Sequence, residues 1–162
     1  MRKSKVAFFI LLGCLVFVSI SHARQTIKEE FGEIIEGSEA MSIAVENGTQ
    51  VVITASKYDR YFVFVYFPRN EALKLIKRIE RALIDAKKPL RLSKNQKSTE
   101  DYGTYRYGES FSVSLDRDSK GSRLMLSAYD QHFIKSVHLW LNEAKAQSFL
   151  SILQKATASM KK

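Results

Sequence analysis

Alternating hydrophobic and polar positions mark the first half of the chain as a series of strands. Residues 41–46 and 49–55 are alternating runs rich in β-branched side chains. Asn47-Gly48 between them is a dipeptide that takes the positive φ angles of a tight hairpin turn. After a second turn, residues 61–67 are β-branched and aromatic throughout, which favours another strand. Residues 31–36 predict a shorter strand ahead of these three.

The spacing of apolar residues then changes to that of a helix. Asn70 is expected to cap its first turn and Glu71 to lie at the positive end of its dipole, while Pro89 limits its extension. The apolar residues share one face of this helix: Ala72, Leu75, Ile76, Ile79, Ala82, Leu83 and Ala86. The first half therefore predicts four strands followed by one helix.

The second half repeats this plan. Phe111, Val113 and Leu115 alternate with serines, so this strand has one buried face and one face lined with hydroxyl groups. Residues 123–127 predict its hairpin partner and residues 132–140 the last strand. Asn142 is expected to cap a helix with its own apolar face: Ala146, Phe149, Leu150, Leu153 and Ala156.

The two halves also share residues at equivalent positions. Four segments recur 70 to 72 positions apart, among them the Tyr-Asp pairs at 58 and 129 and the Asn-Glu-Ala triplets at 70 and 142. The sequence therefore predicts an α+β fold built from a tandem duplication of a ββββα unit. Its two antiparallel sheets are expected to pack as a pseudo-twofold pair with two helices, with copies at residues 24–86 and 102–162 in one compact domain.

This order of elements, over residues 31–160, resembles that of the PUR-repeat and whirly proteins. The resemblance implies a curved sheet that binds single-stranded nucleic acid.

The strand at 61–67 is apolar on both faces, so each face needs a cover. Tyr61, Val63, Val65 and Phe67 occupy one face, and Phe62, Phe64 and Tyr66 occupy the other. Since a single helix covers only one face of a sheet, we expect the other copy to cover the second, with a homodimer or a ligand as the alternatives.

The N-terminus has the pattern of a cleavable secretory signal. Arg2, Lys3 and Lys5 precede an apolar run at 6–20, and Ser21 and Ala23 place small residues before an expected cut after position 23. Cys14 lies in a stretch resembling a lipobox, but the apolar residues that follow it argue for the later cut over a lipid anchor. The sequence predicts an exported protein, periplasmic or secreted.

Loss of this signal changes both the charge and the cysteine content. The mature chain holds 23 basic against 17 acidic residues, a net charge of +6, and no cysteine, because Cys14 is the only one in the sequence. Disulfides and thiol chemistry are thus excluded from the mature chain. Residues 87–101 are expected to form a basic linker, with Lys87, Lys88, Arg91, Lys94 and Lys97.

No pattern in the sequence indicates catalysis or a cofactor. His132 and His138, predicted on one face of the last strand, lack a third metal ligand, and Asp59 and Asp130 are typical turn residues. Asn47-Gly48-Thr49 is formally a glycosylation sequon but also the predicted hairpin turn. We expect no enzyme activity, no metal and no cofactor, since phosphate loops and nucleophile elbows are lacking too.

The remaining hypothesis is binding through one face of the second sheet. Arginines, tyrosines and serines cluster there in the sequence: Arg106, Arg123, Tyr105, Tyr107, Ser112 and Ser114. We expect an exported, non-enzymatic binding protein of the envelope accessory or inhibitor type, acting as a monomer or homodimer. The alternative is a binder of polyanions or single-stranded nucleic acid through a whirly-like or PUR-like sheet; acidic glycans and lipid headgroups are further candidate ligands.

Overall fold

A computed structural model describes residues 26–89, 96–132 and 134–161. The predicted signal peptide at 1–23, its Cys14 and residues 90–95 of the predicted linker lie outside the described residues. Within the described part of the chain, neither helix is long and apolar enough to cross a membrane.

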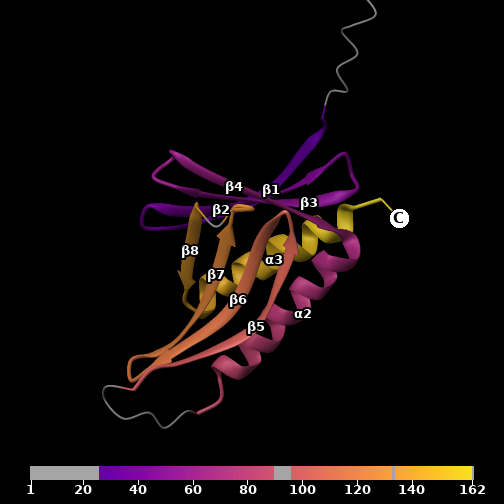
Figure 1. Ribbon diagram of the computed structural model, residues 1–162. Coiled ribbons are helices and arrows are strands. Elements are labelled where there is room, and N and C mark those ends of the chain that lie inside the picture. Colours follow the sequence, from indigo (N-terminus) through magenta and orange to yellow (C-terminus); the bar gives the residue numbers. More distant parts are fainter. Residues whose placement is uncertain (1–25, 90–95, 133, 162) are drawn as a thin grey trace, which may run out of the picture.

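The structure is an α+β fold made of two ββββα units, as predicted (Figure 1). Sheet A consists of β1 (Lys28–Glu36), β2 (Glu39–Glu46), β3 (Gln50–Lys57) and β4 (Tyr61–Pro68), and helix α2 (Arg69–Ala86) follows it. Sheet B consists of β5 (Ser98–Tyr107), β6 (Glu109–Asp118), β7 (Gly121–Tyr129) and β8 (Ser136–Leu141), and helix α3 (Glu143–Ser159) follows it. Both sheets are antiparallel, with their strands in chain order.

Local sequence signals explain the tight connections. Asn47 and Gly48 have φ angles of 54° and 69°, as a hairpin turn with two positive φ angles requires, and Tyr58 and Asp59 adopt similar values in the next turn. The Asn47 side chain accepts a hydrogen bond from the Ile27 backbone amide at 3.2 Å, so the turn also holds the start of the described chain.

A β-bulge interrupts the first strand of each copy at the same place. The register shifts between Glu30 and Gly32 in β1 and between Asp101 and Gly103 in β5. The bulge leaves Gly32 and Gly103 with φ angles of 149° and 112°, a region that favours glycine. The repeated glycines of the sequence are therefore the bulge positions of the two sheets.

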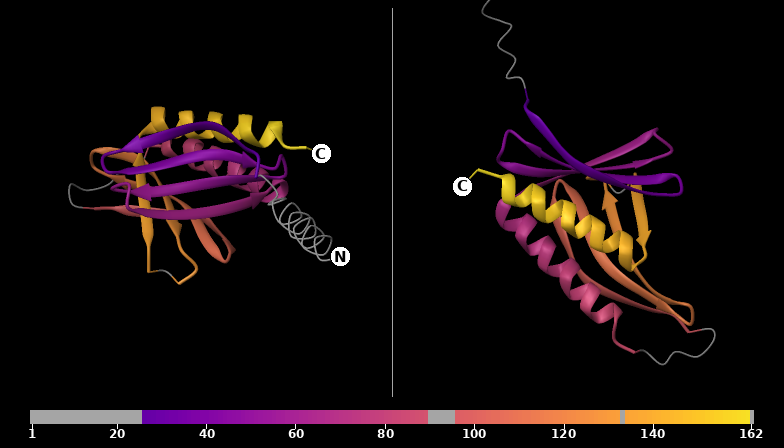
Figure 2. Two further views of the ribbon diagram at one scale, coloured as in Figure 1. Left: turned by 90° about the horizontal axis from the view of Figure 1, so that it is seen from above. Right: turned by 180° about the vertical axis from the view of Figure 1, so that it is seen from behind.

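Each helix packs mainly against the sheet of the other copy. Helix α3 contacts β1 and β2 of sheet A, whereas α2 contacts β5 and β6 of sheet B. Sheet A lies across one end of sheet B, and the two helices run side by side beneath it (Figure 2). This crossed arrangement is the pseudo-twofold packing that the duplication predicts, and the two copies share one hydrophobic core.

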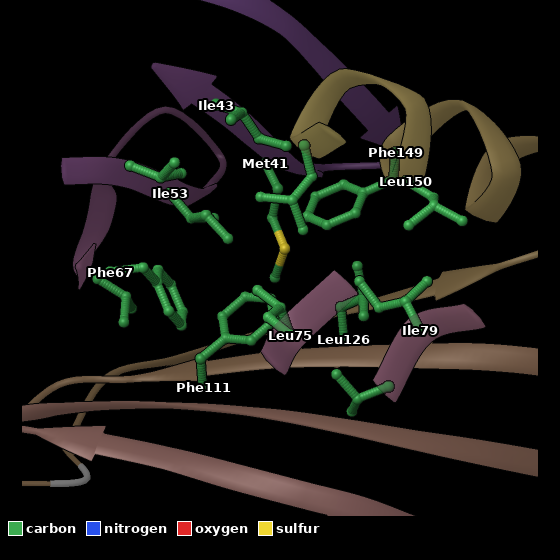
Figure 3. Packing of buried hydrophobic residues seen from close by; sticks show 14 of the residues in the cluster. Met41, Ile43, Ile53, Phe67, Leu75, Ile79, Phe111, Leu126, Phe149 and Leu150 are labelled. Atoms are coloured by element: carbon green, nitrogen blue, oxygen red, sulfur yellow. The ribbon is translucent and has the colours of Figure 1, made fainter. Parts of the chain in front are cut away.

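The core fills the space between both sheets and both helices (Figure 3). Met41 of sheet A lies between Phe149 of α3 and Phe111 of sheet B, and all three are at least 99 % buried. The apolar face predicted for α2 is buried except for Ala86, which is half-buried, and the predicted apolar face of α3 is buried throughout.

Polar groups tie the end of α2 to sheet B. The buried Asp85 carboxylate accepts hydrogen bonds from Lys88 at 2.5 Å and from the Tyr102 hydroxyl at 2.7 Å. These two bonds, the Lys88 one foremost, lower the pKa of Asp85, and burial followed by the bond to Asp85 raises the pKa of Tyr102. Arg117 donates to the Asp85 carbonyl at 2.9 Å, which satisfies an end carbonyl of the helix.

Four sequence expectations differ from the structure. Asn70 does not cap α2, because Pro68 occupies the N-cap with an extended ψ of 155° and the helix has already begun at Arg69. Asn142, by contrast, caps α3 as predicted, because its side chain accepts a hydrogen bond from the Lys145 backbone N–H at 2.9 Å. β5 begins at Ser98, inside the predicted linker, where it pairs with Arg117 of β6. β8 begins at Ser136, so His132 belongs to the preceding turn.

The fourth difference concerns the cover of sheet A. The second copy packs on the face of sheet A that carries Val63, Val65 and Phe67. On the opposite face, Phe62 is 46 % exposed and Phe64 is 43 % exposed. The expectation that the second copy covers these two rings was wrong, because both helices and sheet B meet the same face of sheet A.

Valine at Gly32 tests the crossed packing. A Cβ there would lie 3.0 Å from Ile152 of α3, whereas nothing lies within 4 Å of a Cβ at Gly121, which has a similarly positive φ. We expect Gly32→Val to lower the free energy of unfolding by about 2 kcal/mol more than Gly121→Val, measured by urea denaturation. Equal losses in the two variants would mean that backbone strain alone makes this glycine necessary.

Candidate binding face on sheet B

The outer face of sheet B carries the polar residues of its alternating strands. Its side chains form cross-strand rows that follow from the register. The rows are Arg106, Ser110, Tyr129 and Ser136; Thr104, Ser112, Ser127 and His138; Asp101, Ser114, Met125 and Trp140; and Thr99, Asp116 and Arg123. These four rows are called the serine face below.

Hydrogen bonds hold several of these side chains in place. His138 Nδ1 and Ser127 Oγ lie 2.8 Å apart, and the Trp140 indole N–H donates to Asp116 at 3.2 Å. Thr99 donates to the other oxygen of Asp116 at 2.8 Å. The Asp116 carboxylate is therefore occupied by neighbours on its own face, and it fixes the orientation of the indole ring.

Three aromatic rings form a contact row over β7 and β8. The ring centroids of Tyr129 and His138 are 5.4 Å apart, and those of His138 and Trp140 are 5.9 Å apart. Trp140 is 37 % exposed. The row offers a partner apolar surface whose rings are already oriented, at little cost in conformational entropy.

The predicted arginines lie on this face but far from each other. Arg106 and Arg123 pair with Ser110 and Asp116, which are six residues apart along β6 and thus about 20 Å apart. Ser112 lies between them and is half-buried, while Ser114 is 94 % buried. Among the described residues, the hydroxyls of Ser110 and Ser114 are buried without a hydrogen-bond partner. Of the two predicted serines, Ser112 is thus the accessible one.

The predicted tyrosines do not join the arginines. Tyr105 pairs with Phe111 on the core face of β5 and is 8 % exposed. Its ring contacts that of Phe67, with centroids 4.5 Å apart and an interplanar angle of 32°. Its hydroxyl donates to the Tyr66 carbonyl at 2.9 Å. Tyr107 is 78 % exposed, but it lies at the end of β5, beyond the core and on the same side of the strand as Tyr105. Tyr105 is therefore unavailable for stacking on a ligand.

His138 and Trp140 lie on the serine face in place of the two predicted tyrosines, and the sequence pattern of β8 indicates this position. Ser136, His138 and Trp140 alternate with the buried Val137, Leu139 and Leu141 along β8. This is the same polar and apolar alternation that predicts the serine face on β6, and it places the histidine and the tryptophan beside those serines.

The candidate catalytic residues occupy ordinary structural positions. His132 lies in the turn before β8 and contacts the Gln131 side chain, so it does not share a strand face with His138. Asp130 accepts from the Ile134 amide at 2.8 Å, and Asp59 lies in the turn before β4. In the described ranges, no three His, Cys, Asp or Glu side chains gather as metal ligands would.

A basic hollow adjoins the serine face at Arg123. It has a volume of about 730 Å³ and lies beside the turn between β6 and β7. Its cationic lining residues are Lys97, Lys120 and Arg123, and Asp118 is the one carboxylate among its described lining residues. The Asp118 side chain accepts from the Lys120 backbone amide at 2.7 Å. The hollow is thus an attractive position for an anionic group.

Comparisons with known proteins give little further information. No family model matches the chain, and no curated protein matches it in sequence. Among solved structures, WHY1 from Arabidopsis thaliana is similar with a TM-score of 0.41 and 10 % identity, over 85 % of this chain and 86 % of that chain. At this level the similarity carries no argument about function.

The pH dependence of stability should report on His138. Burial lowers its pKa, with an opposing effect of Glu39 and a smaller lowering effect of Lys57. As the pH falls through about 6.5, the unfolded chain takes up a proton on this residue that the folded protein resists, so the free energy of unfolding falls. We expect the loss between pH 7.5 and 5.5, measured by urea denaturation, to be smaller in His138→Gln. An unchanged loss would mean that the imidazole titrates alike in both states.

Proposed function

We propose that the mature chain is an exported, non-enzymatic binding protein that contacts a macromolecular partner through the serine face. The observation that carries the proposal is the position of Trp140, Tyr129 and Arg123 on one sheet face whose opposite side is the core. Tryptophan, tyrosine and arginine are the residues that contribute most to binding energy in protein interfaces.

The state of these side chains supports this function. Trp140 is held by Asp116, and His138 by Ser127, so two members of the aromatic row lose little freedom on binding. The arginines at the two ends of the face add charge at its rim, where it directs partner choice and association rate. Export rests on the N-terminal signal pattern, and an envelope accessory protein or an inhibitor fits both features.

A second candidate function is binding of a polyanion such as an acidic glycan, an anionic lipid headgroup or single-stranded nucleic acid. The basic hollow favours it, because Lys97 and Lys120 lie beside Arg123 of the serine face. A negatively charged chain that enters the hollow reaches the aromatic row through Arg123, which would add ring stacking to the ionic contacts.

Affinity capture tests the leading proposal. The mature chain is used to capture partners from its own envelope or medium, alongside a variant with Arg106→Glu and Arg123→Glu. We expect the double variant to lose the partner, because both ends of the serine face change sign. A control variant with Lys77→Glu and Lys155→Glu makes the same change in net charge on the exposed sides of α2 and α3 and should keep it. Retention of the partner by the Arg106/Arg123 variant would refute the proposed face.

Salt dependence separates the two candidates. Trp140 is the only tryptophan, so its fluorescence reports directly on the serine face. If the partner is a polyanion, heparin or single-stranded DNA should change this fluorescence at low salt, and the affinity should fall steeply as salt rises. Lys97→Glu with Lys120→Glu should then abolish the response. Absence of any response at low salt would end the polyanion candidate and leave the leading proposal in place.

A further inference from the structure

Strand β4 forms an edge of sheet A that is apolar and uncovered. Phe62 and Phe64 are 46 % and 43 % exposed, with ring centroids 6.4 Å apart, and no charged residue interrupts the strand between Tyr61 and Pro68. Seen from above, β1 lies beside α3, while β4 is the edge on the far side of the sheet (Figure 2). Such an edge lacks the charges and bulges that usually protect edge strands from pairing.

The backbone of β4 presents its hydrogen-bonding groups to this edge at alternate residues. The Tyr66 carbonyl points away from β3, since it accepts from the Tyr105 hydroxyl. In an antiparallel strand the N–H and C=O of one residue point to the same side, and every second residue repeats the direction. The backbone groups of Phe62 and Phe64 therefore also face the edge, where among the described residues no other backbone group pairs with them.

The occupied part of the edge limits what can pair with it. Tyr105, whose ring contacts Phe67, reaches the edge at Tyr66, so the open part runs from Tyr61 to Val65. A strand that pairs here must therefore be short, or must turn away before it passes Tyr66.

We propose that a second copy of this chain fills the open edge, with the two β4 strands antiparallel and Phe62 of each copy opposite Phe64 of the other. In this register both residues of each pair have edge-facing backbone groups, so the pairs exchange hydrogen bonds. The second copy's strand begins at its own Tyr61, opposite Val65, so only its turn residue Arg60 lies level with Tyr66. The phenylalanine rings of both copies then meet on the outer face as cross-strand pairs.

Charges at the two ends of the open edge complement each other in this register. Arg60 of the second copy comes opposite Tyr66, close to Glu109 at the start of β6. Glu109 lies two residues before Phe111, whose ring centroid is 5.7 Å from that of Phe67, the neighbour of Tyr66. It also contributes, after burial and Glu46, to the raised pKa of Tyr66. Among the described residues neither Arg60 nor Glu109 has an ion-pair partner within its own chain. Because the dimer is twofold symmetric, the pair between Arg60 of one copy and Glu109 of the other occurs twice.

The size of this contact predicts a weak dimer. The open edge spans only five residues, Tyr61 to Val65, so it buries less than the ~800 Å² per partner of a standard interface. We therefore expect a dissociation constant of about a micromolar or weaker.

Sedimentation velocity over a range of concentrations tests the dimer. The mature chain should shift from monomer to dimer as its concentration rises, and Phe64→Lys should stay monomeric. Ile35→Lys is the control, because Ile35 is 59 % exposed on the same outer face but lies on β1, at the other edge. It should dimerise normally. A wild-type chain that stays monomeric at millimolar concentration overturns the proposal.

Charge reversal tests the register. Arg60→Glu and Glu109→Lys should each weaken the dimer about three- to tenfold, because each change breaks two symmetry-related pairs. The double variant should restore the original dissociation constant, which a loss of folding in either single variant could not mimic. If the double variant fails to restore dimerisation while keeping the wild-type circular dichroism spectrum and melting temperature, the register is wrong.

Discussion

The packing of each helix on the sheet of the other copy is the constraint on which the rest of this structure depends. A four-stranded sheet with one helix has a face that its own helix cannot complete, and here two such units complete each other. Met41, Phe111 and Phe149 come from both sheets and a helix, yet they meet at one point of the core. Removal of either copy would expose apolar residues of the other, so the two repeats form a single stability unit.

This arrangement also decides which surfaces remain open. Both helices and the end of sheet B occupy one face of sheet A, so its outer face keeps Phe62 and Phe64 in solvent. The outer face of sheet B is open for the same reason, but it carries serines, histidine and tryptophan instead of phenylalanines. The duplication thus supplies the same scaffold twice, and the chemistry of the two outer faces has diverged.

The two outer faces suit different kinds of contact. On sheet B, Asp116 and Ser127 hold Trp140 and His138, and Arg123 links the aromatic row to a basic hollow, a combination suited to a polar or anionic partner. On sheet A, the edge strand offers backbone groups and phenylalanines, which suit pairing with another strand. Asp85, with Lys88, Tyr102 and Arg117, plays a different part, because it joins α2 to sheet B beneath the surface.

The sequence by itself determined the order of elements, the hairpin at Asn47-Gly48 and the buried helix faces, because turn geometry and hydrophobic periodicity are local properties. It also placed Arg106, Arg123 and Ser112 on one face. Only the tertiary structure decided that Tyr105 is buried and that Phe62 and Phe64 are not. Tyr105 and Tyr107 flank Arg106 in unbroken register after the bulge, so alternation already places both tyrosines on the face opposite this arginine. That this opposite face is the core at Tyr105, where the Phe67 ring lies 4.5 Å away between centroids, follows from how the two copies pack. Which face of sheet A is covered depends on how the two copies cross, and that is a property of the whole core.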